Sequence, residues 1–306
     1  MKAFTQPLHD LSEYEQIVSD LAGHRTPIHI DGCIDSQKCH LISSIGEPYP
    51  VKLIVTYNEI KAKEIYADYQ FFDRNVFYYP AKDIIFYNAD IHGNLIVSQR
   101  MAVIKRMLEG EPVTVITTID GLFDRLLPLE EIAKNRLIFR AEDVLPLEAL
   151  SRELTAMGFE RVSQVESPGQ FAVRGGILDI YNLADECPYR LELWGDEIDS
   201  IRSFDAESQR SIEQVDKVII YPATEYVMSA AVRDRGLKMI DQDMKRQVKR
   251  LKDGQNYETA TRLTQVIAEL KENLEISSAS SGIDSLVQYF YGHTVSFLSY
   301  FDRDDS

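Results

Sequence analysis

Two kinds of apolar pattern alternate through the first 125 residues of the chain. Short runs rich in β-branched and aromatic residues are typical of buried strands, and longer segments with apolar residues three or four apart are typical of helices. The predicted strands are Ile28–Ile30, Val51–Thr56, Val76–Tyr79 and Val113–Thr118, and the predicted helices are Gln37–Ile45, Glu59–Gln70 and Leu95–Leu108. Strands this apolar, separated by helices, favour a parallel sheet that is covered on both faces.

Beyond about residue 126 the pattern becomes that of a small α+β domain. Leu137–Phe139 and a helix over Leu145–Met157 precede several short strands with alternating polar and apolar positions. These strands are Phe171–Arg174, Ile177–Tyr181, Tyr189–Trp194 and Glu197–Phe204. Gly195-Asp196 joins the last two and suits a two-residue hairpin turn, so the pattern predicts an antiparallel meander.

The last part of the chain is mostly helical and highly charged. Ala230–Leu274 has helical periodicity with a break near Gly254-Gln255-Asn256, which predicts two helices. We expect a loop at Ser277–Ser281, after which the sequence becomes apolar again. The final residues, Asp304-Asp305-Ser306, contain no obvious terminal element, and we expect the chain to be a fragment of a longer protein.

Composition and charge narrow the classes of function. The 306 residues carry 33 Lys+Arg and 49 Asp+Glu, a net charge of −16. This charge argues against a protein whose main task is to hold nucleic-acid backbones, because that affinity comes from Lys and Arg displacing counterions. No apolar run approaches the roughly 20 residues that span a bilayer, and the N-terminus has no apolar signal core. The three cysteines are too few and too scattered for a disulfide framework or a four-ligand zinc site, so we expect a cytoplasmic protein with neither metal nor membrane.

The segment after the first predicted strand partly matches a phosphate-binding loop. Gly32 and Lys38 fit the pattern Gly-x-x-x-x-Gly-Lys-Ser/Thr, but Gln37 replaces the second glycine and Cys39 replaces the magnesium-binding hydroxyl. The second glycine lets the backbone amides curl around the phosphates, and Asp35 would add a carboxylate to a site meant for a polyanion. An ordinary loop and a relic of a nucleotide site fit these residues equally well. We expect no ATP binding here and no cofactor in this chain.

Two further motifs look functional, but their sequence context favours a structural interpretation. Asp196–Asp199 spells the Asp-Glu-x-Asp string of helicase-type ATPases, but it stands at a predicted hairpin turn instead of after a buried parallel strand. The basic run Lys245–Lys252 could contact nucleic acid. However, Asp241, Asp243 and Asp253 flank it and no aromatic residue is interleaved for base stacking, so the sequence favours a solvated helical face.

Two arginines and the single tryptophan gather on the predicted strands of the α+β domain. Arg190 and Trp194 are four residues apart on one strand and therefore point to the same face, and Arg174 ends a nearby strand. Arg and Trp are the residue types most enriched at binding hot spots. The same residues also fit a core tryptophan with arginines in surface salt bridges, and the pattern leaves both interpretations open.

A long stretch around these residues resembles the UvrB-homology module of transcription-repair coupling factors. The resemblance is carried by Phe171–Tyr181, Tyr189–Trp194, Asp196–Arg202, Phe204-Asp205, the typical run Ser208–Ser211 and, upstream, Tyr78–Pro80 and Thr117–Leu122. UvrB shares the second domain, but it would need an intact phosphate loop at Gly32–Cys39. It would also need a long aromatic-rich insertion after Tyr78–Pro80, where this chain has only a short connection.

The resemblance implies an α/β fold with an insertion. Residues 1–125 and 222–306 would form a degenerate helicase-like, P-loop-type parallel-sheet domain built from N- and C-terminal parts. Residues 126–221 would form an inserted small α+β domain that binds UvrA. The second part, from residue 222, would be largely helical at first.

The resemblance also implies a role in transcription-coupled nucleotide excision repair. Coupling factors are ATP-driven DNA translocases that displace stalled RNA polymerase and recruit UvrA. The motor, with its ATP and Mg, and the contacts to RNA polymerase and double-stranded DNA would lie beyond Ser306. This chain would then be a non-catalytic module that binds UvrA through Arg174, Arg190 and Trp194, the last replacing a phenylalanine of the family.

The UvrA-binding surface is expected to be masked in the full-length protein, and two other functions would also fit parts of the sequence. In the full-length protein, the resemblance implies that a C-terminal domain covers the UvrA-binding surface and gives autoinhibition. One rival is a module that binds nucleic acid directly through Lys245–Lys252. The other is a UvrB-like helicase fragment, which the altered loop at Gly32–Cys39 disfavours.

Overall fold

The computed structural model describes residues 5–82, 90–276 and 286–301. The described residues fall into two units. Unit 1 holds 5–82, 106–124 and 301, and unit 2 holds 90–105, 125–276 and 286–300. The three-part division at residues 126 and 222 stays a prediction.

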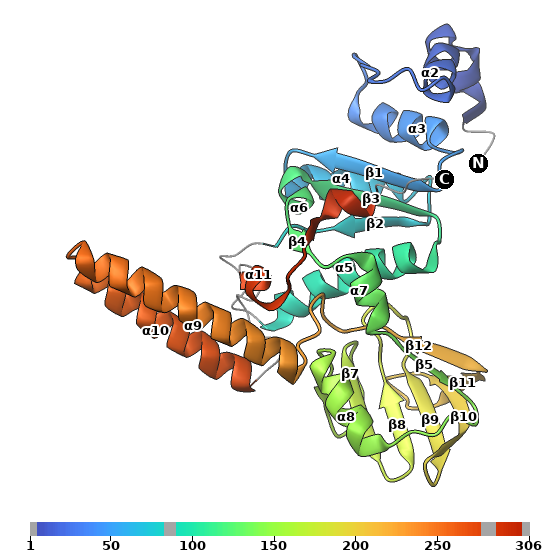
Figure 1. Cartoon of the computed structure of the whole chain (residues 1–306). Coiled ribbons are helices and arrows are strands. Elements are labelled where there is room, and N and C mark those ends of the chain that lie inside the picture. The colour runs from blue at the N-terminus through green and yellow to red at the C-terminus, as the bar shows by residue number, and fades with distance from the viewer. Residues whose placement is uncertain (1–4, 83–89, 277–285, 302–306) are drawn as a thin grey trace. The chain divides into compact units, whose positions relative to one another are not determined.

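A parallel sheet of three strands, in the order β1-β3-β2, lies at the centre of unit 1 (Figure 1). The strands are β1 (Val51–Thr56), β2 (Val76–Tyr79) and β3 (Val113–Thr118). β3 is the middle strand and is buried along its whole length, which explains its unbroken run of β-branched residues. The parallel sheet predicted from the sequence is confirmed.

Unit 1 also contains short helices. They are η1 (Gln6–Asp10), α2 (Ser12–Ala22), α3 (Asp35–Ile45), α4 (Glu59–Tyr69) and α6 (Ile119–Leu122). Of these, α4 and α6 lie against the strands of the sheet. Ala62 and Tyr69 of α4 pack with Cys39, Tyr78 and Ile116 in one buried cluster. α5 (Asp90–Glu109) belongs partly to each unit. The three predicted helices therefore exist, with α5 beginning earlier than expected.

The first predicted strand is wrong. Residues 25–34 have no regular secondary structure, and Ile30 is 39% exposed. The segment Ile28-His29-Ile30 follows Pro27, which has no N–H for a sheet ladder, and it pairs with no strand in the described part of unit 1. Residues Gly32–Cys39, which partly match a phosphate-binding loop, therefore do not follow a strand.

Unit 2 contains a six-stranded sheet in the order β11-β10-β9-β8-β7-β6. Its strands are β6 (Glu160–Arg161), β7 (Gln170–Arg174), β8 (Ile177–Ile180), β9 (Tyr189–Trp194), β10 (Glu197–Phe204) and β11 (Ser211–Gln214). Strands β7 to β10 form the predicted antiparallel meander, β11 extends it by a strand that the sequence did not predict, and β6 runs parallel to β7. Gly195 at the β9–β10 turn has φ +65°, which is a conformation that favours glycine.

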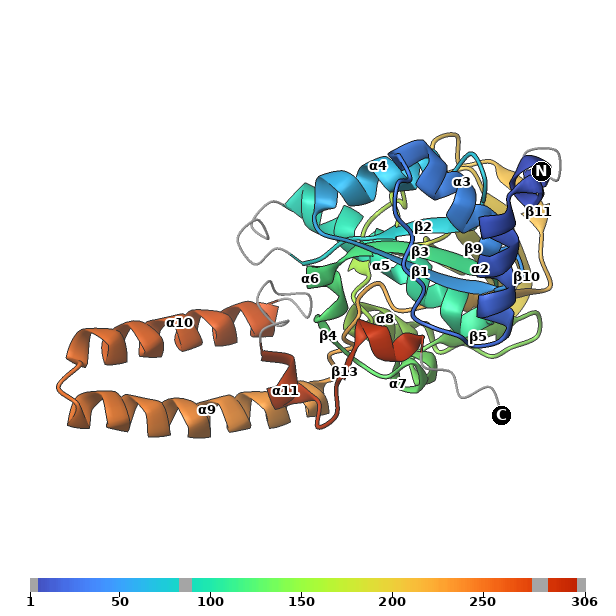
Figure 2. The same cartoon turned by 90° about the horizontal axis from the view of Figure 1, so that it is seen from above.

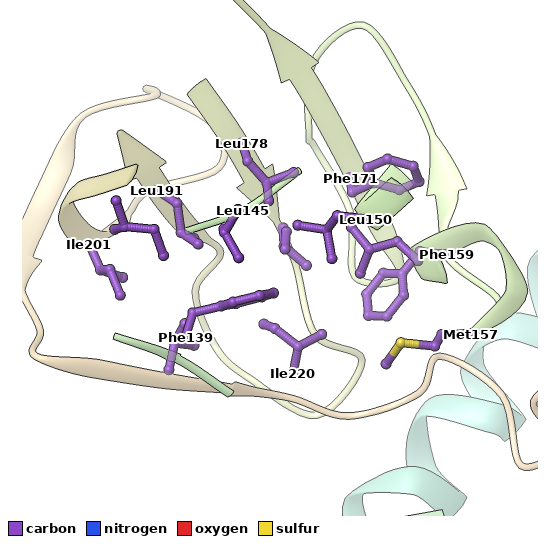
Figure 3. Close-up of a cluster of buried hydrophobic side chains, with 14 residues drawn as sticks. Phe139, Leu145, Leu150, Met157, Phe159, Phe171, Leu178, Leu191, Ile201 and Ile220 are labelled. Atoms are coloured by element: carbon purple, nitrogen blue, oxygen red, sulfur yellow. The ribbon is translucent and has the colours of Figure 1, made fainter. Parts of the chain in front are cut away.

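One face of this sheet builds the main core of unit 2. Helix α8 (Leu147–Ala156) and the antiparallel pair of β5 (Leu137–Arg140) and β12 (Lys217–Ile220) pack against it. Figure 3 shows Leu150, Leu178, Leu191, Phe139 and Ile220 converging from these elements. Burying each such side chain contributes about 1.5–3 kcal/mol, so this face of the sheet is fixed by packing.

The remaining elements of unit 2 are mostly helical. They are β4 (Arg125–Leu126), α7 (Leu129–Lys134), α9 (Ala230–Asp253), α10 (Tyr257–Ile276), α11 (Val287–Phe290), β13 (Val295–Ser296) and η3 (Phe297–Tyr300). α9 and α10 lie side by side as an antiparallel helical hairpin (Figure 2), so the predicted pair of helices is confirmed. The predicted loop Ser277–Ser281 and the last residues Asp304–Ser306 lie outside the described residues. Across the described ranges, no helix has the length and hydrophobicity to cross a membrane.

Candidate functional site

The candidate residues lie on the face of the six-stranded sheet opposite the main core. Leu191 and Leu193 of β9 pack into that core, so alternation places Arg190 and Trp194 on the other face. Arg174 joins them there through the register, in which it stands opposite Ile177 of β8, and Ile177 stands opposite Glu192 of β9.

A buried carboxylate joins the two arginines. Asp179 stands directly opposite Arg190 in the β8–β9 register and has no exposed surface. Its Oδ1 accepts a hydrogen bond from Arg190 Nε at 2.7 Å, and its Oδ2 accepts one from Arg190 Nη2 at 2.9 Å. Oδ2 also accepts from Arg174 Nη2 at 2.6 Å. Two guanidinium groups thus compensate the cost of burying this carboxylate.

Arg190 is braced by further contacts. Its guanidinium carbon lies 4.4 Å from the centroid of the Phe204 ring, a cation–π arrangement. The main-chain oxygen of Gln209 accepts from Nη1 at 3.4 Å, and its Oε1 accepts from Nη2 at 3.1 Å. The hydrogen bonds to Asp179 raise the pKa of Arg190 above its usual value. Four of its five N–H donors are therefore used, and one on Nη1 remains.

Gln209 connects the family-typical run Ser208–Ser211 to the site. It has φ +60°, and its Nε2 donates to the main-chain oxygens of Val165 at 3.0 Å and Ala206 at 2.7 Å. These bonds hold both Gln209 acceptors against Arg190. The run therefore has a structural task, which is to fix the guanidinium of Arg190.

Arg174 and Trp194 are the groups that reach solvent. The Arg174 side chain is 43% exposed, and in the described part of the chain only its Nη2 is hydrogen-bonded. Trp194 is 86% exposed, which rules out the core interpretation of this residue. The arginines do form salt bridges, as the alternative interpretation held, but with the buried Asp179 instead of a surface acid.

Sequence reasoning missed Asp179, Phe204 and Gln209 as parts of the site. Asp179 left one signal, because it is the single acidic residue in the apolar strand Ile177–Tyr181 and alternates with Leu178. The sequence could not predict that Arg190 is its partner, because the long connection between β8 and β9 does not fix which residues of the two strands face each other.

The side chains of Gly32–Cys39, the segment that partly matches a phosphate-binding loop, bond to one another and to nearby residues. Gln37 Oε1 accepts a hydrogen bond from the backbone N–H of Ile34 at 3.1 Å, at the start of α3. Lys38 Nζ donates to Asp35 Oδ1 at 3.2 Å, and Lys61 Nζ donates to Asp35 Oδ2 at 2.6 Å. The bonds from Lys61 and then Lys38 lower the pKa of Asp35. A carboxylate that is ionised at neutral pH thus holds the lysine that would otherwise face a phosphate.

The remaining residues named from the sequence add no chemistry in the described ranges. Gly32 has φ +80° and lies in the irregular segment before α3, and Cys39 is buried, which raises the pKa of its thiol. Asp196–Asp199 occupies the β9–β10 turn and the start of β10, away from any parallel strand. Among the residues that the structure describes, no group of three or more His, Cys, Asp or Glu is arranged to hold a metal ion.

The six-stranded sheet lies in a region that matches a known protein family. Residues 137–226, which include the whole meander and the Arg174–Asp179–Arg190 cluster, match the family model described as the UvrB interaction domain. This part of the chain is similar to the UvrB interaction domain. The resemblance inferred from the sequence is confirmed.

Curated relatives extend the similarity over most of the chain. The transcription-repair-coupling factor of Bacillus subtilis (strain 168) is 31% identical over 81% of this chain and 21% of its own length. UvrABC system protein B of Thermosipho africanus (strain TCF52B) is 28% identical over 86% of this chain and 42% of its own length. The transcription-repair-coupling factor of Staphylococcus aureus (strain USA300) is 32% identical over 62% of this chain and 17% of its own length. This chain thus spans less than half the length of each of these relatives.

Proposed function

We propose that this chain is a non-catalytic module that binds UvrA and recruits it to RNA polymerase stalled at DNA damage. Its UvrB interaction domain supports UvrA as the partner. The observation that carries the proposal is the exposed pair Arg174 and Trp194 on one sheet face, where the buried Asp179 holds Arg174. RNA polymerase, ATP, Mg and the contacts of the DNA motor to double-stranded DNA would belong to other parts of a longer protein.

Each residue of the site has a separate task in this proposal. Arg174 offers its remaining N–H donors to carboxylates of UvrA, where planar charge-assisted bonds are strong and specific. Trp194 supplies apolar area beside them. Arg190 holds Asp179, which holds Arg174, and it adds its one remaining Nη1 hydrogen.

The finer fold assignment belongs to the same proposal. The parallel sheet of unit 1 would be a helicase-like, P-loop-type domain that has lost nucleotide binding, with the UvrB interaction domain inserted into it. In the longer protein a C-terminal domain would cover Arg174 and Trp194 and would prevent UvrA binding until it moves.

The binding test uses two variants whose side chains are exposed, so that the fold is spared. Arg174→Ala and Trp194→Ala are titrated with UvrA by isothermal calorimetry beside the unsubstituted chain. Each should weaken the complex at least about 30-fold, since losing one partner of a desolvated charge pair or a hot-spot aromatic costs about 2–5 kcal/mol. Arg190→Ala should lose binding as well.

A matched control separates the site from general effects of charge. Arg152→Ala removes an exposed arginine from α8, which packs on the opposite face of the same sheet, and it should bind UvrA like the unsubstituted chain. Dissociation constants for Arg174→Ala and Trp194→Ala equal to that of the control would reject the assignment of the site.

The non-catalytic part of the proposal is tested with nucleotide. Gln37, Asp35 and Lys38 satisfy one another and the start of α3, so a labelled ATP analogue at micromolar concentration should not bind saturably to this chain. ATP hydrolysis should stay at the level of the buffer. Saturable binding that Lys38→Ala abolishes would instead support the helicase-fragment alternative.

A further inference from the structure

The basic run Lys245–Lys252 lies on α9, and acidic residues offset its positive charge less than the sequence indicates. Asp241 and Asp243 stand beside it, but Asp241 is ion-paired with Lys271 of α10. Asp243 is paired with Arg246 and also accepts a hydrogen bond from Tyr289 Oη at 2.8 Å, which lowers the pKa of its carboxyl group. Both acids are therefore engaged by partners inside unit 2.

Four cations of the run have exposed side chains without an ion pair or hydrogen bond to any described residue. They are Lys245, Lys249, Arg250 and Lys252. Of the three acids that flank the run in the sequence, only Asp253 is left to offset them. A local excess of positive charge thus stands on a chain whose net charge is −16.

The lysines line one side of a groove between α9 and α10. The groove has a volume of about 470 Å³ and is lined by Met244, Lys245, Val248, Lys249, Lys252, Asp253 and Thr264. The α10 positions one turn before and after Thr264 are Ala260, Thr261, Ile267 and Ala268, none of them acidic. Asp253 at the end of α9 is therefore the one carboxylate among the lining residues.

The spacing of the lysines suits a regular line of negative charges. Lys245, Lys249 and Lys252 are four and three residues apart, so they follow one edge of α9 over roughly 10 Å. Duplex DNA carries one negative charge per about 1.7 Å of its axis when both strands are counted, so a stretch of this length contains about six phosphates, about three of them on each strand.

We propose that this edge of the α9–α10 hairpin is a binding site for the phosphate backbone of duplex DNA. The cations extend beyond the groove, because Arg250 lies well over a quarter turn from Lys245 around α9. Arg250 is about 100–160° from the three lysines around the helix and stands outside this edge, so the site consists of the line of three ammonium groups, which suits the phosphates of a duplex backbone. The site needs no bases to stack and is independent of the UvrA site.

The test measures duplex binding and its salt dependence by fluorescence anisotropy. A labelled duplex of about 20 base pairs is titrated with the full chain between about 20 and 200 mM KCl, and its affinity should fall with salt at a log–log slope of about −3. The variant K245A/K249A/K252A should bind at least about tenfold more weakly at the lowest salt. Its slope should be shallower by about 0.9 for each lost contact.

Two controls make the result specific. K63A/K134A/K217A removes the same charge from exposed lysines outside α9 and α10 and should keep the affinity and slope of the unsubstituted chain. K245R/K249R/K252R should also keep them, because the positive charge remains. UvrA binding by K245A/K249A/K252A should be unchanged, which separates this site from the recruiting function.

Three outcomes would overturn the proposal. The first is no duplex binding by the unsubstituted chain at the lowest salt. The second is an equal loss of affinity in the groove variant and in the matched lysine control. The third is tighter binding of labelled poly-glutamate than of the duplex, which would assign the groove to an acidic protein partner.

Discussion

At the scale of single residues, Asp179 gives the two arginines different physical roles. Arg190 is 14% exposed and bonds the buried carboxylate with two donors, whereas Arg174 is 43% exposed and bonds it with one. A residue can therefore be essential for partner binding because it touches the partner or because it holds the residue that does. Stability measurements distinguish these two cases.

The first prediction compares the stability of two arginine variants. Arg190→Ala should lower the free energy of unfolding by about 3 kcal/mol, because Asp179 then keeps a buried charge without its bidentate partner. Arg174→Ala should lower it by less than about 1 kcal/mol, because solvent screens this more exposed pair. Urea denaturation followed by circular dichroism measures both values.

Asp179→Asn provides the check on this explanation. In the Asp179→Asn background, Arg190→Ala should lower the free energy of unfolding much less than it does in the unsubstituted chain, because no buried charge is left unpaired. Equal urea midpoints for the two single arginine variants would contradict the different roles assigned to them. A loss of UvrA binding in Arg174→Ala alone is then the cleaner evidence for contact.

At the scale of elements, the contact between α9 and α11 depends on one glycine. Gly236 lies within α9 and is buried against Phe290 of α11, and a Cβ at this position would lie 2.0 Å from the Phe290 ring. In an open helix Gly→Ala stabilises by about 1 kcal/mol. At Gly236 the close approach to the aromatic ring should make the same substitution destabilising.

The second prediction tests this reversal. Gly236→Ala should lower the free energy of unfolding by about 1–3 kcal/mol, because the packed ring must move to admit a methyl group. Gly254→Ala at the end of the same helix is the control, since its Cβ would have no contact closer than 3.4 Å and its stability should stay within about 0.5 kcal/mol. A more stable Gly236→Ala, measured by urea denaturation, would refute the close approach of α9 and α11.

At the scale of the whole molecule, buried tyrosines link stability to alkaline pH. Burial raises the pKa of Tyr69 and Tyr78 in unit 1, and of Tyr189 in unit 2, each to about 12. In the unfolded chain a tyrosine ionises near pH 10. Above that pH ionisation of these tyrosines stabilises the unfolded state, whereas in the folded state they stay neutral up to about pH 12. The free energy of unfolding therefore keeps its full tyrosine contribution below about pH 10 and falls toward pH 12.

The third prediction follows from this linkage. The urea midpoint of the chain should be constant between about pH 8 and 9 and should fall steadily from about pH 10 upward. Tyr78→Phe should make this fall shallower, and its stability at neutral pH should be little changed because the Tyr78 hydroxyl is buried without a hydrogen-bond partner among the described residues. An identical alkaline fall in both proteins would show that Tyr78 does not contribute.

Much of the local structure was predictable from the sequence because it depends on neighbours along the chain. The strand runs Val51–Thr56 and Val113–Thr118, the turn at Gly195 and the helix break at Gly254 are signals of periodicity and turn chemistry. The same reasoning failed at Ile28–Ile30, where the segment resembles a strand in composition but pairs with none of the strands that the structure describes.

By itself the sequence determined the two sheet patterns, the helical hairpin and the likeness to coupling factors, since these are written in residues close together in the chain. Only the tertiary structure decided that Asp179 stands opposite Arg190, that Trp194 is exposed, and that Asp241 pairs with Lys271. Each of these facts depends on which distant residue faces which, and that choice is made by strand register and helix packing. The charges and side chains of the candidate sites were visible in the sequence, and their partners were not.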